Sequence, residues 1–572
     1  SYTCSTVSNC IKFNGDNLTL DNSGTITHDT ADKDNVIRFA TSGSNDGENF
    51  TIINSGTIHN ETGNNAIYFS GTDGGYIKNT GTIKVTAKKG TIKSQDNTNF
   101  IIDNYGTITN LSTNGQAIES LGDDTGTINN YAGGIISAPN NTQSAEKGAF
   151  NTKTNDESDG WTINNWGTIS ANYDTMTIGN GYTVNNYGTI KTTNYDTPAI
   201  IPVGDNNTIN LYDGTILIGY IDDGTEDDGG ATSGHALNLN FSCSSYDFKV
   251  VGDYTVKDNS KCSNVVHSGG YARSVSTIFQ STADELLALK VDLVNETLDF
   301  INNTEENKDE QFGFVSKSYT DRENGEAIDK FAAHKKNFVI IQPRNSERSN
   351  SFATFSLSLD DIKLSNLEVE SSNFQYGFFF NDLNLFKKNK ISFKTIFGAN
   401  MYSSDRTQLN NSVASGKETI KENNHSFSTI IGSQLSGNYK NGYIKTNLDA
   451  GFERFSQFNE ADDVSWDSRL LGQFMGDVTY GWKKEFKNKI FVNPELTFGY
   501  RTLIAGKDQK YQVNGSDLTF NNGVQEDAFV KFALKSNYAI GKNTNLFFNT
   551  SAKKTTEDQE TYSFNLSLKS IF

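Results

Sequence analysis

The chain has 572 residues and a formal net charge of −19, with 50 Gly but only 5 Pro and 3 Met. Its mean hydropathy of −0.54, together with the lack of any run of about 18 apolar residues, excludes a helical membrane protein. A transmembrane β-barrel remains compatible, because only every second residue of its strands faces lipid. The abundance of Gly, Asn, Thr, Ser and aromatic residues is typical of strands and turns.

The negative charge is concentrated in the first half of the chain. Residues 1–280 contain 15 Lys and Arg against 30 Asp and Glu, whereas residues 281–572 contain 34 against 38. This balance argues against nucleic acid or anionic lipid as a partner of the first half. We interpret the acidic side chains as a solvated surface that keeps this half soluble.

The four cysteines form two close pairs, Cys4 with Cys10 and Cys243 with Cys262. Neither pair has other zinc-binding residue types at a suitable spacing, so local disulfides of an exported protein are the better interpretation. The sequence starts at Ser1 without a charged and then apolar leader. A mature exported protein whose signal peptide has been removed would look like this.

The first 220 residues repeat a short unit, Asn-x-Gly-Thr-Ile. Full copies start at Asn22, Asn54, Asn79, Asn104, Asn165 and Asn186, and shorter Gly-Thr-Ile copies start at Gly126 and Gly214. Most successive glycines lie 20 to 32 residues apart, and one gap of 41 equals about two units. A second short strand that ends in Asn precedes many copies, as in Phe50–Asn54.

This period and these short strands predict a right-handed parallel β-helix. The inward Ile, Val and Phe side chains would stack from coil to coil into one core. We expect the repeated glycine to take positive φ at a corner and the repeated asparagine to form side-chain ladders or local turns. A leucine-rich horseshoe is excluded because its Leu-x-x-Leu-x-Leu pattern is missing.

Residues 225–275 lose the repeat but still alternate apolar and polar side chains. An open end of a β-helix is an exposed edge that must be blocked. We therefore predict that 225–275 forms the last coils or a cap, pinned by the second cysteine pair.

Residues 282–302 form the only long helix that we predict. Thr282 followed by Glu285 fits a capping box. One apolar stripe runs along the helix, consisting of Leu287, Val291, Val294, Leu298 and Ile301. The opposite face is charged, and such a helix spans about 30 Å. These charges exclude contact with lipid but suit the polar lumen of a barrel.

From about residue 310 onward, strands of period two alternate with turns. In the hairpin 474–500, apolar side chains such as Val478 and Phe498 share one face and polar ones such as Thr479 and Glu495 share the other. Apolar-out and polar-in alternation is the pattern of transmembrane β-barrels. We predict about twelve strands: 336–343, 350–360, 374–383, 390–402, 426–436, 442–455, 467–484, 489–503, 508–513, 525–540, 543–553 and 561–572. A start near 311–318 is an alternative for the first strand.

The last segment alternates an aromatic or aliphatic side chain with a polar one. One face carries Tyr562, Phe564, Leu566, Leu568 and Phe572. A strand that ends on a phenylalanine resembles the last strand of Gram-negative outer-membrane barrels. In that family the aromatic end is part of the signal read by the barrel-assembly machinery.

In this order, the parts resemble a monomeric autotransporter of the type V secretion family, with a passenger similar to the AIDA/pertactin-like group. The corresponding domains are a β-helix passenger at 1–275, a linker with its helix at 276–309, and an autotransporter barrel at 310–572. The overall class is all-β apart from the helix. The resemblance implies an outer-membrane location, lipid and the assembly machinery as partners, and a passenger on the cell surface.

The resemblance also implies a possible release site. In some family members the passenger is cut between two Asn residues in the lumen helix, and Asn302–Asn303 loosely matches that site. The alternative is an ordinary helix end with Asn as its cap.

The passenger lacks the motifs of an enzyme. No Gly-x-Ser-x-Gly or His-Glu-x-x-His motif occurs. Asp124-Thr125-Gly126 imitates an aspartic-protease triplet but falls in register with the repeat, so we interpret it as a corner. The acidic stretches 71–75 and 222–229 lack the spacing of known Ca²⁺ loops, and we expect neither a metal nor a cofactor.

One aromatic recurs at the same place in several repeats: Tyr105, Trp166 and Tyr187. We expect these rings to stack along the rod, although a glycan-binding stripe would use the same residues. The main hypothesis is a non-enzymatic surface protein for adhesion or self-association, with glycans, host or neighbouring cells, or its own passenger as partner. The alternative is a surface enzyme that acts on polysaccharide through grouped carboxylates on the β-helix.

Overall fold

The computed structural model describes most of the chain and divides it into two compact units. The described residues are 2–4, 9–13, 15–29, 34–39, 48–86, 89–121, 125–142, 148–152, 160–224, 232–242, 244–259, 265–275, 278–302, 311–323, 331–346, 349–364, 367–386, 389–439, 442–460, 464–486, 490–521, 526–541, 544–556 and 560–571. The first unit comprises Ser1–Val275 together with Gln408–Glu418, and the second comprises Ser276–Thr407 and Thr419–Phe572.

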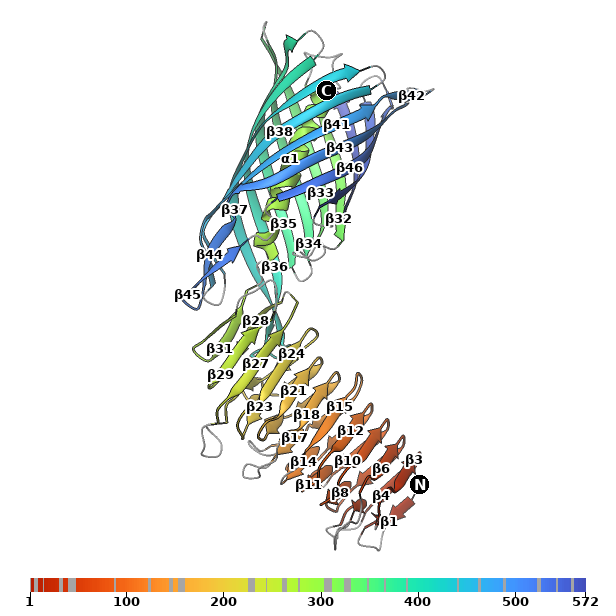
Figure 1. The fold of residues 1–572 in the computed structure, drawn as a ribbon. Coiled ribbons are helices and arrows are strands. Elements are labelled where there is room, and N and C mark those ends of the chain that lie inside the picture. The colour runs from red at the N-terminus through yellow and green to blue at the C-terminus, as the bar shows by residue number, and fades with distance from the viewer. Residues whose placement is uncertain are drawn as a thin grey trace. The chain divides into compact units, whose positions relative to one another are not determined.

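The first unit is a parallel β-helix in which each coil contributes one strand to each of three sheets (Figure 1). The first sheet contains β1 (Tyr2–Cys4), β4 (Thr25–His28), β7 (Thr57–Asn60), β10 (Thr82–Val85), β13 (Thr107–Asn110), β16 (Ile135–Ala138), β19 (Thr168–Ala171), β22 (Thr189–Thr192) and β25 (Ile216–Ile218). The second contains β2 (Ile11–Phe13), β5 (Ile37–Phe39), β8 (Ile67–Ser70), β11 (Ile92–Gln95), β14 (Ile118–Leu121), β17 (Phe150–Thr152), β20 (Met176–Ile178), β23 (Pro198–Pro202) and β26 (Tyr220–Ile221). The third contains β3 (Thr19–Asn22), β6 (Thr51–Asn54), β9 (Tyr76–Asn79), β12 (Phe100–Asn104), β15 (Gly126–Asn130), β18 (Thr162–Asn165), β21 (Thr183–Asn186), β24 (Thr208–Tyr212), β27 (His235–Asn240) and β29 (Tyr254–Asp258).

The repeats stack in register, so the same position of each copy meets the next copy. Ile83 lies between Ile58 and Ile108 in the first sheet, and all three are fully buried. A second column of buried aromatics runs through the core, and neighbouring rings such as Phe39 and Phe50 stack at 3.9 Å between centroids. This stacking of like side chains confirms the β-helix that the repeat predicted.

The repeated glycine serves close packing rather than an unusual backbone angle. A Cβ on Gly81 would lie 2.1 Å from the carbonyl oxygen of Gly56, and one on Gly106 would lie 2.2 Å from that of Gly81. None of these three glycines has a positive φ. The expectation of a left-handed corner is therefore wrong for the full copies of the repeat, where the constraint comes from the neighbouring coil and not from the local turn. It is right for the shorter copy at Gly214, which has a φ of 93°.

The end of the β-helix combines further coil strands with a small antiparallel sheet. β27 and β29 continue the third sheet. β28 (Ser245–Lys249) pairs antiparallel with β31 (Tyr271–Ser274), which pairs with β30 (Val266–Ser268). Cys243 and Cys262 lie outside the described residues, so the pairing predicted for them stays a prediction.

The second unit begins with the helix α1 (Ile278–Asn302). It starts one turn before the predicted Thr282, so the capping-box assignment is wrong. Ser276, Thr277, Ser281 and Thr282 are all residue types that favour a helix start, and a further turn costs little once a helix has nucleated. Among the described helical residues, no segment is both long and apolar enough to cross a bilayer.

Twelve antiparallel strands then form a closed barrel (Figure 1). In order around the barrel they are β32 (Phe312–Glu323), β33 (Phe331–Ser346), β34 (Ser349–Leu364), β35 (Leu367–Phe386), β36 (Asn389–Asn410), β37 (Lys417–Tyr439), β38 (Gly442–Phe455), β41 (Arg469–Trp482), β43 (Ile490–Ala505), β46 (Glu526–Ala539), β47 (Thr544–Thr555) and β48 (Glu560–Ile571). The barrel closes where β32 pairs with β48, from Phe312 opposite Ile571 to Glu323 opposite Glu560.

The predicted strand count agrees with this barrel, but one of the predicted strands lies outside it. The predicted strand 508–513 is β44 (Asp508–Val513), which joins β39 (Phe458–Glu460), β40 (Val464–Trp466) and β45 (Ser516–Asn521) in a separate sheet. Six residues are too few for a spanning strand, which needs about 9–11. The first barrel strand is instead β32, at the alternative start. The short strand β42 (Lys484–Phe486) pairs with β43.

Candidate functional site

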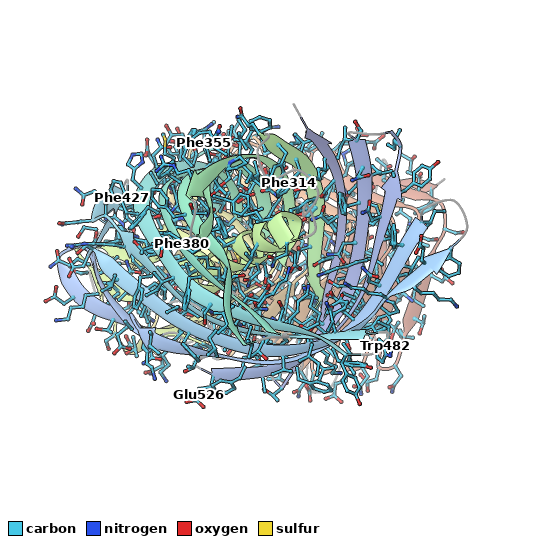
Figure 2. The ribbon with its side chains drawn as sticks, turned by 90° about the horizontal axis from the view of Figure 1, so that it is seen from above. Phe314, Phe355, Phe380, Phe427, Trp482 and Glu526 are labelled. Carbon is cyan, nitrogen blue, oxygen red and sulfur yellow. A yellow bond between two sulfur atoms is a disulfide. The ribbon has the colours of Figure 1, made fainter. Side chains whose placement is uncertain are left out.

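The helix α1 lies inside the barrel, and from Ala283 to Asn302 most of its side chains are buried or half-buried, with Asp292 exposed (Figure 2). The predicted stripe is buried: Leu287, Val291, Val294, Leu298 and Ile301 are at most 3% exposed. The charged Asp284 and Lys290 on the other face are also buried. Its polar partners come from β36, β37, β38, β43, β46 and β48, so the strands surround it.

Apolar contacts hold one side of the helix. Phe300 stacks on Phe314 of β32 at 4.1 Å between ring centroids and meets Phe547 of β47 edge-on at 4.7 Å. Figure 2 shows Phe314 turned inward, whereas Phe355 and Phe427 lie on the outside of the ring of strands. Part of the inner wall of the barrel is therefore an apolar surface against which the helix packs.

Lys290 anchors the first half of the helix to two strands. Its ammonium donates to Glu453 Oε1 at 2.7 Å and to the Tyr402 hydroxyl at 2.6 Å. The Tyr402 hydroxyl also donates to Glu453 Oε1 at 2.7 Å. Glu453 is fully buried, so removing its cation would leave a carboxylate without compensation.

Asn295 binds a second buried ion pair near the middle of the helix. Lys394 and Asp449 lie 2.5 Å apart and are almost inaccessible to solvent. The Asn295 side chain donates to Asp449 Oδ2 at 3.0 Å, and its oxygen accepts from Lys394. An amide that both donates and accepts fits between the two opposite charges.

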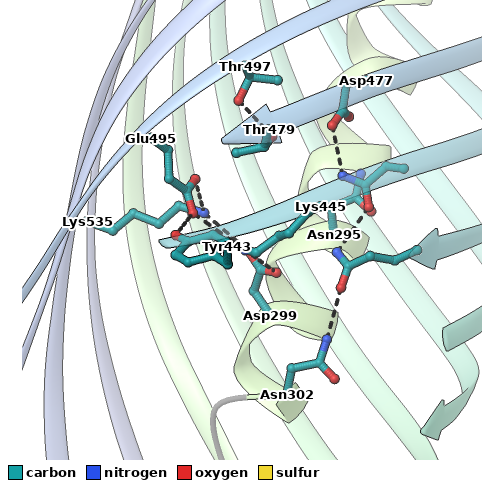
Figure 3. A network of polar contacts seen from close by, with 12 residues as sticks. Asn295, Asp299, Asn302, Tyr443, Lys445, Asp477, Thr479, Glu495, Thr497 and Lys535 are labelled. Atoms are coloured by element: carbon teal, nitrogen blue, oxygen red, sulfur yellow. Dashed lines mark hydrogen bonds and ion pairs between the residues drawn. The ribbon is translucent and has the colours of Figure 1, made fainter. Parts of the chain in front are cut away.

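Asp299 is the centre of a third cluster near the end of the helix (Figure 3). Lys445 and Lys535 donate to its carboxylate at 3.0 and 3.1 Å. Lys535 also lies 2.8 Å from Glu495, which accepts from the Tyr443 hydroxyl. Two cations thus share two carboxylates, one from the helix and one from β43.

Further contacts tie both ends of the helix to the wall. Arg501 donates to Glu285 at 2.6 Å, and Asn565 donates to Glu296 at 2.6 Å. At the last helical residue, Asn302 donates to Gln434 at 3.0 Å. Such paired and hydrogen-bonded groups hold a helix in place, and the arrangement is that of a clamp rather than of a reaction centre.

The predicted release site is only partly visible in the structure. Asn302 ends the helix, and the partner of its side chain is the amide of Gln434. Asn303 lies outside the described residues. Cleavage at this bond therefore stays a prediction.

The outer face of the barrel is apolar. Val478, Phe498 and Trp482 are about 40–57% exposed, whereas Thr479 and Glu495 are buried on the inward side. In the last strand, Tyr562, Phe564, Leu566 and Leu568 are 41–49% exposed on the same outward face, and Phe572 lies outside the described residues. Contiguous exposed aromatic and aliphatic side chains match a hydrocarbon environment.

Five aromatic rings stack along one corner of the β-helix: Tyr105, Tyr131, Trp166, Tyr187 and Tyr212. Successive ring planes are within 11° of parallel, and their centroids are 4.1–5.7 Å apart. Tyr105, Trp166 and Tyr187 thus belong to one stack, as predicted. Tyr131 and Tyr212, from degenerate repeats, belong to the same stack. Because each inner ring presents its faces to its neighbours, those faces are not available to a sugar.

Two ladders of asparagine side chains run beside this stack. The buried ladder joins Asn22, Asn54, Asn79, Asn104, Asn130, Asn165 and Asn186 through amide hydrogen bonds of 2.7–2.8 Å. The outer ladder joins Asp103, Asn129, Asn164, Asn185, Asn210 and Asn238 at 2.8–2.9 Å. Each inner amide donates to one neighbouring coil and accepts from the other, so the ladders connect successive coils.

Asp73 and Asp222 lie in the two acidic stretches, 71–75 and 222–229. Asp73 accepts hydrogen bonds from the Thr98 hydroxyl at 2.6 Å and the Asn99 amide at 3.0 Å, and these bonds lower the pKa of its carboxyl. Burial raises the pKa of Asp222 to about 6. The remainder of the second stretch, 225–229, lies outside the described residues.

His235 lies next to the second acidic stretch and is engaged locally. Its ring nitrogens contact the Thr232 hydroxyl at 2.9 Å and the Asn207 backbone N–H at 3.4 Å. Cys4 and Cys10 form a disulfide at the other end of the unit. In the described part of the chain, no three His, Cys, Asp or Glu residues gather in a way that could hold a metal ion.

Comparison with known proteins finds similar chains only among solved structures. No protein-family model matches the chain, and no curated protein matches it. The translocator domain of the autotransporter NalP from Neisseria meningitidis is 13% identical, with a TM-score of 0.40 over 52% of this chain and 100% of that one. The β domain of the Bordetella autotransporter BrkA is 9% identical, with a TM-score of 0.36 over 46% and 100%. The transport unit of the autotransporter AIDA-I from Escherichia coli is 9% identical, with a TM-score of 0.35 over 47% and 92%.

The class of the protein follows from its own architecture. A parallel β-helix is followed along the chain by a helix inside a closed, twelve-stranded barrel with an apolar outer face. This is the order of parts that the resemblance to monomeric autotransporters implies, so the fold agrees with that expectation.

Proposed function

We propose that the protein is an outer-membrane autotransporter that displays its β-helix on the cell surface as a non-enzymatic rod for adhesion or self-association. The observation that carries this proposal is the helix α1, clamped inside a barrel whose outer face is apolar. The barrel spans the membrane, and the helix connects it to the displayed part of the chain.

The outward side chains of the barrel support the membrane location. On β41, the exposed Val478 alternates with the buried Thr479. A tilted strand needs about 9–11 residues to cross the hydrocarbon core of a bilayer. β41 has 14 residues, which is enough for that distance.

The surface chemistry of the rod supports a role in contact rather than catalysis. Its outward asparagines bind one another in a ladder, and its stacked rings bind their neighbours. Groups that are engaged in this way stiffen a surface and hold it in one shape. A stiff, regular surface can pair with a cell surface or with a second rod over several coils.

Truncation tests this function. Variants that lack whole coils from the first residue onward are compared with the full chain in cells that insert both barrels equally. We expect cell–cell or surface attachment to fall with each set of coils removed, while barrel insertion is unchanged. Equal attachment by the full chain and by a variant without the rod would overturn the proposal.

The alternative is a surface enzyme that cleaves polysaccharide. Asp222 and Asp223 are the observation that favours this enzyme, because they are two buried carboxyl groups next to each other. Burial raises the pKa of Asp222 to about 6, and carboxyl groups with a raised pKa are common in active sites. A glycan panel separates the two functions when binding and turnover are both measured. Depolymerisation that is lost in the Asp222→Asn variant would establish the alternative.

A further inference from the structure

A lysine, an asparagine and an aspartate meet inside the barrel, each from a different element. Asn295 belongs to α1, Lys394 to β36 and Asp449 to β38. Lys394 Nζ donates to Asn295 Oδ1 and lies 2.5 Å from Asp449 Oδ1. Asn295 Nδ2 donates to Asp449 Oδ2 at 3.0 Å. We call these three residues the lumen triad, and each of them contacts the other two.

The backbone of β37 leaves room for the lumen triad. Gly432 lies directly opposite Asp449 in the pairing of β37 with β38. A Cβ on Gly432 would overlap Asp449 Oδ1 and would lie 2.5 Å from Lys394 Cε. A side chain at this position would therefore push the carboxylate and the lysine out of place. Glycine allows the two charged groups to lie together against the helix.

Water is largely excluded from the charged members of the lumen triad. The side chains of Lys394 and Asp449 are 0% and 1% exposed. Beside them, Ile396 of β36 and Ile430 of β37 belong to the apolar cluster that packs around the helix. Desolvated lysine amines are nucleophiles in several classes of enzyme once a base removes their proton. The lumen triad places such an amine, a base and a carboxamide in one buried site.

We propose that the lumen triad forms an intramolecular amide bond between Lys394 Nζ and Asn295 Cγ, with Asp449 as the proton-transfer group. Nζ already contacts the carboxamide oxygen, and the carbon that it attacks is one bond away from that oxygen. Groups that the fold holds in this way react without a further loss of translational freedom. Asp449 lies within reach of both nitrogens, as a general acid and base must.

The reaction balances without a co-reactant. Asp449 first accepts a proton from the Lys394 ammonium, and the neutral Nζ attacks Asn295 Cγ. The carboxyl proton then passes to Asn295 Nδ2, the Cγ–Nδ2 bond breaks, and ammonia leaves. Asp449 accepts the extra proton from Nζ and passes it to the ammonia, which departs as ammonium. The products are a secondary amide, ammonium and the original carboxylate, and no group is oxidised or reduced.

Two other lysines of the lumen have different partners. Lys290 donates to a carboxylate and a phenol, and Lys445 lies against two carboxylates. An ionised carboxylate repels a nucleophile and offers no neutral leaving group. The carboxamide of Asn295 is uncharged and releases ammonia. Of these three clusters, the lumen triad is therefore the one whose chemistry permits a covalent bond.

The bond fixes the displayed chain to the barrel, and this role rests on the proposed display of the rod. Asn295 precedes the predicted release site Asn302–Asn303 along the chain. A cut at that site leaves Asn295 on the rod side of the cut, and the new amide still joins it to Lys394 of the barrel. The rod then resists a pull that would break the non-covalent contacts of α1.

Intact-mass measurement of the reduced full chain, purified from outer membranes, tests the bond. We expect the native chain to be lighter by one ammonia than the mass calculated from its own sequence. After trypsin digestion we expect fragments 291–308 and 391–406 in one branched peptide, because trypsin does not cut after an acylated lysine.

The loss of ammonia should accompany folding, because the lumen triad comes from three separate elements. A chain that is recovered unfolded from inclusion bodies should have its full calculated mass. After it folds into lipid vesicles, the same chain should be lighter by one ammonia.

Lys394→Arg is the most informative variant. It keeps a positive charge beside Asp449, but a guanidinium is always protonated and is not a nucleophile, so we expect the full calculated mass in a folded barrel. Asn295→Ala should also have its full mass, and it adds no bulk to the lumen. The matched control is Asn302→Ala, which removes another helix amide that bonds to the wall. It should lose one ammonia as the native chain does.

Two outcomes would overturn the proposal. The first is the full calculated mass in the folded native chain, with fragment 291–308 and a fragment ending at Lys394 recovered separately. The second is a loss of ammonia that persists in Lys394→Arg, which would assign it to cyclisation of an asparagine. The mass is read without any assay of attachment, so failure of the bond and failure of the proposed function are told apart.

Discussion

At the scale of the residue, asparagine has two roles in the rod, and burial separates them. Asn104 in the buried ladder is fully inaccessible and donates to Asn130 at 2.8 Å, while it accepts from Asn79. Asn164 in the outer ladder makes similar bonds to Asn129 and Asn185 but remains in contact with water. If a ladder hydrogen bond is lost, water can replace the missing partner in the outer ladder at Asn164 but not in the buried ladder at Asn104.

The two ladders should therefore respond differently to truncation. We expect Asn104→Ala to lower the free energy of unfolding of the rod by about 2–4 kcal/mol, because its buried neighbours lose their partners. The control Asn164→Ala should cost about 1 kcal/mol or less. Urea unfolding of the full chain, followed by tryptophan fluorescence, measures both. Equal losses would contradict this account of burial.

Asp222 and His235 give the last coils opposite responses to pH. Burial raises the pKa of Asp222 to about 6 from 3.8, so the stability it contributes is complete below 3.8 and is lost as pH rises through about 6. Burial lowers the pKa of His235 from 6.5, so its contribution is present above 6.5 and is lost as pH falls through the lowered value. The nearby carboxylates of Asp205, Asp223 and Asp253 oppose this lowering.

The variant Asp222→Asn removes the contribution of Asp222 to the pH dependence and leaves that of His235. We expect it to stabilise the last coils above pH 6 by roughly 2 kcal/mol and to have little effect below pH 4. Hydrogen exchange of 208–258 as a function of pH measures the difference. A variant that is less stable than the native chain at pH 7.5 would contradict the assigned direction.

At the scale of the element, ion pairs hold α1 in the lumen. A single helical residue, Asp299, forms ion pairs with both Lys445 and Lys535. Removing one member of a buried pair leaves the others uncompensated, whereas an exposed pair such as Lys363 with Glu368 exchanges its partner for water.

Asp299→Asn should loosen the helix. We expect a loss of roughly 3 kcal/mol in the stability of the folded barrel, read as a lower temperature of heat modification on gels. In planar bilayers we also expect Asp299→Asn to show more channel openings than the intact protein. Lys363→Met is the control and should change neither readout. Native behaviour of Asp299→Asn would show that apolar contacts such as Phe300 with Phe314 are sufficient.

The outward face of a barrel strand should not tolerate a charge. Val478 is 49% exposed on that face. We expect Val478→Arg to destabilise the inserted barrel by about 2–4 kcal/mol, because the guanidinium would enter hydrocarbon. Val478→Phe, which is also larger, should fold normally. Equal folding of both variants in lipid vesicles would place this strand outside the hydrocarbon layer.

At the scale of the whole molecule, the chain should remain in one piece. The side chain of Asn302, the last residue of α1, donates to Gln434 of the barrel wall at 3.0 Å, which holds this end of the helix in place. We expect a single band near 62.9 kDa from purified outer membranes on a denaturing gel. Two bands that merge into one in Asn302→Ala would show instead that the passenger is released.

Much of this architecture could be predicted from the residues. The period of the Asn-x-Gly-Thr-Ile repeat determined the β-helix, and the alternation around Val478 and Phe498 determined the barrel. Both patterns are local, because they depend on which side of a strand or coil a side chain occupies. The stripe from Leu287 to Ile301 likewise determined a helix with one apolar side.

Only the tertiary structure decided which residues meet across the chain. Strand 508–513 has the same alternation as a barrel strand, and its length and partners alone exclude it from the barrel. The partners of Asp299, the close approach at Gly81 and the contact of Lys394 with Asn295 join residues that are far apart in sequence or lie on successive coils. Periodicity reports the face of an element and carries no information about the neighbour that covers it, so the sequence by itself determined the elements and the folded chain decided their contacts.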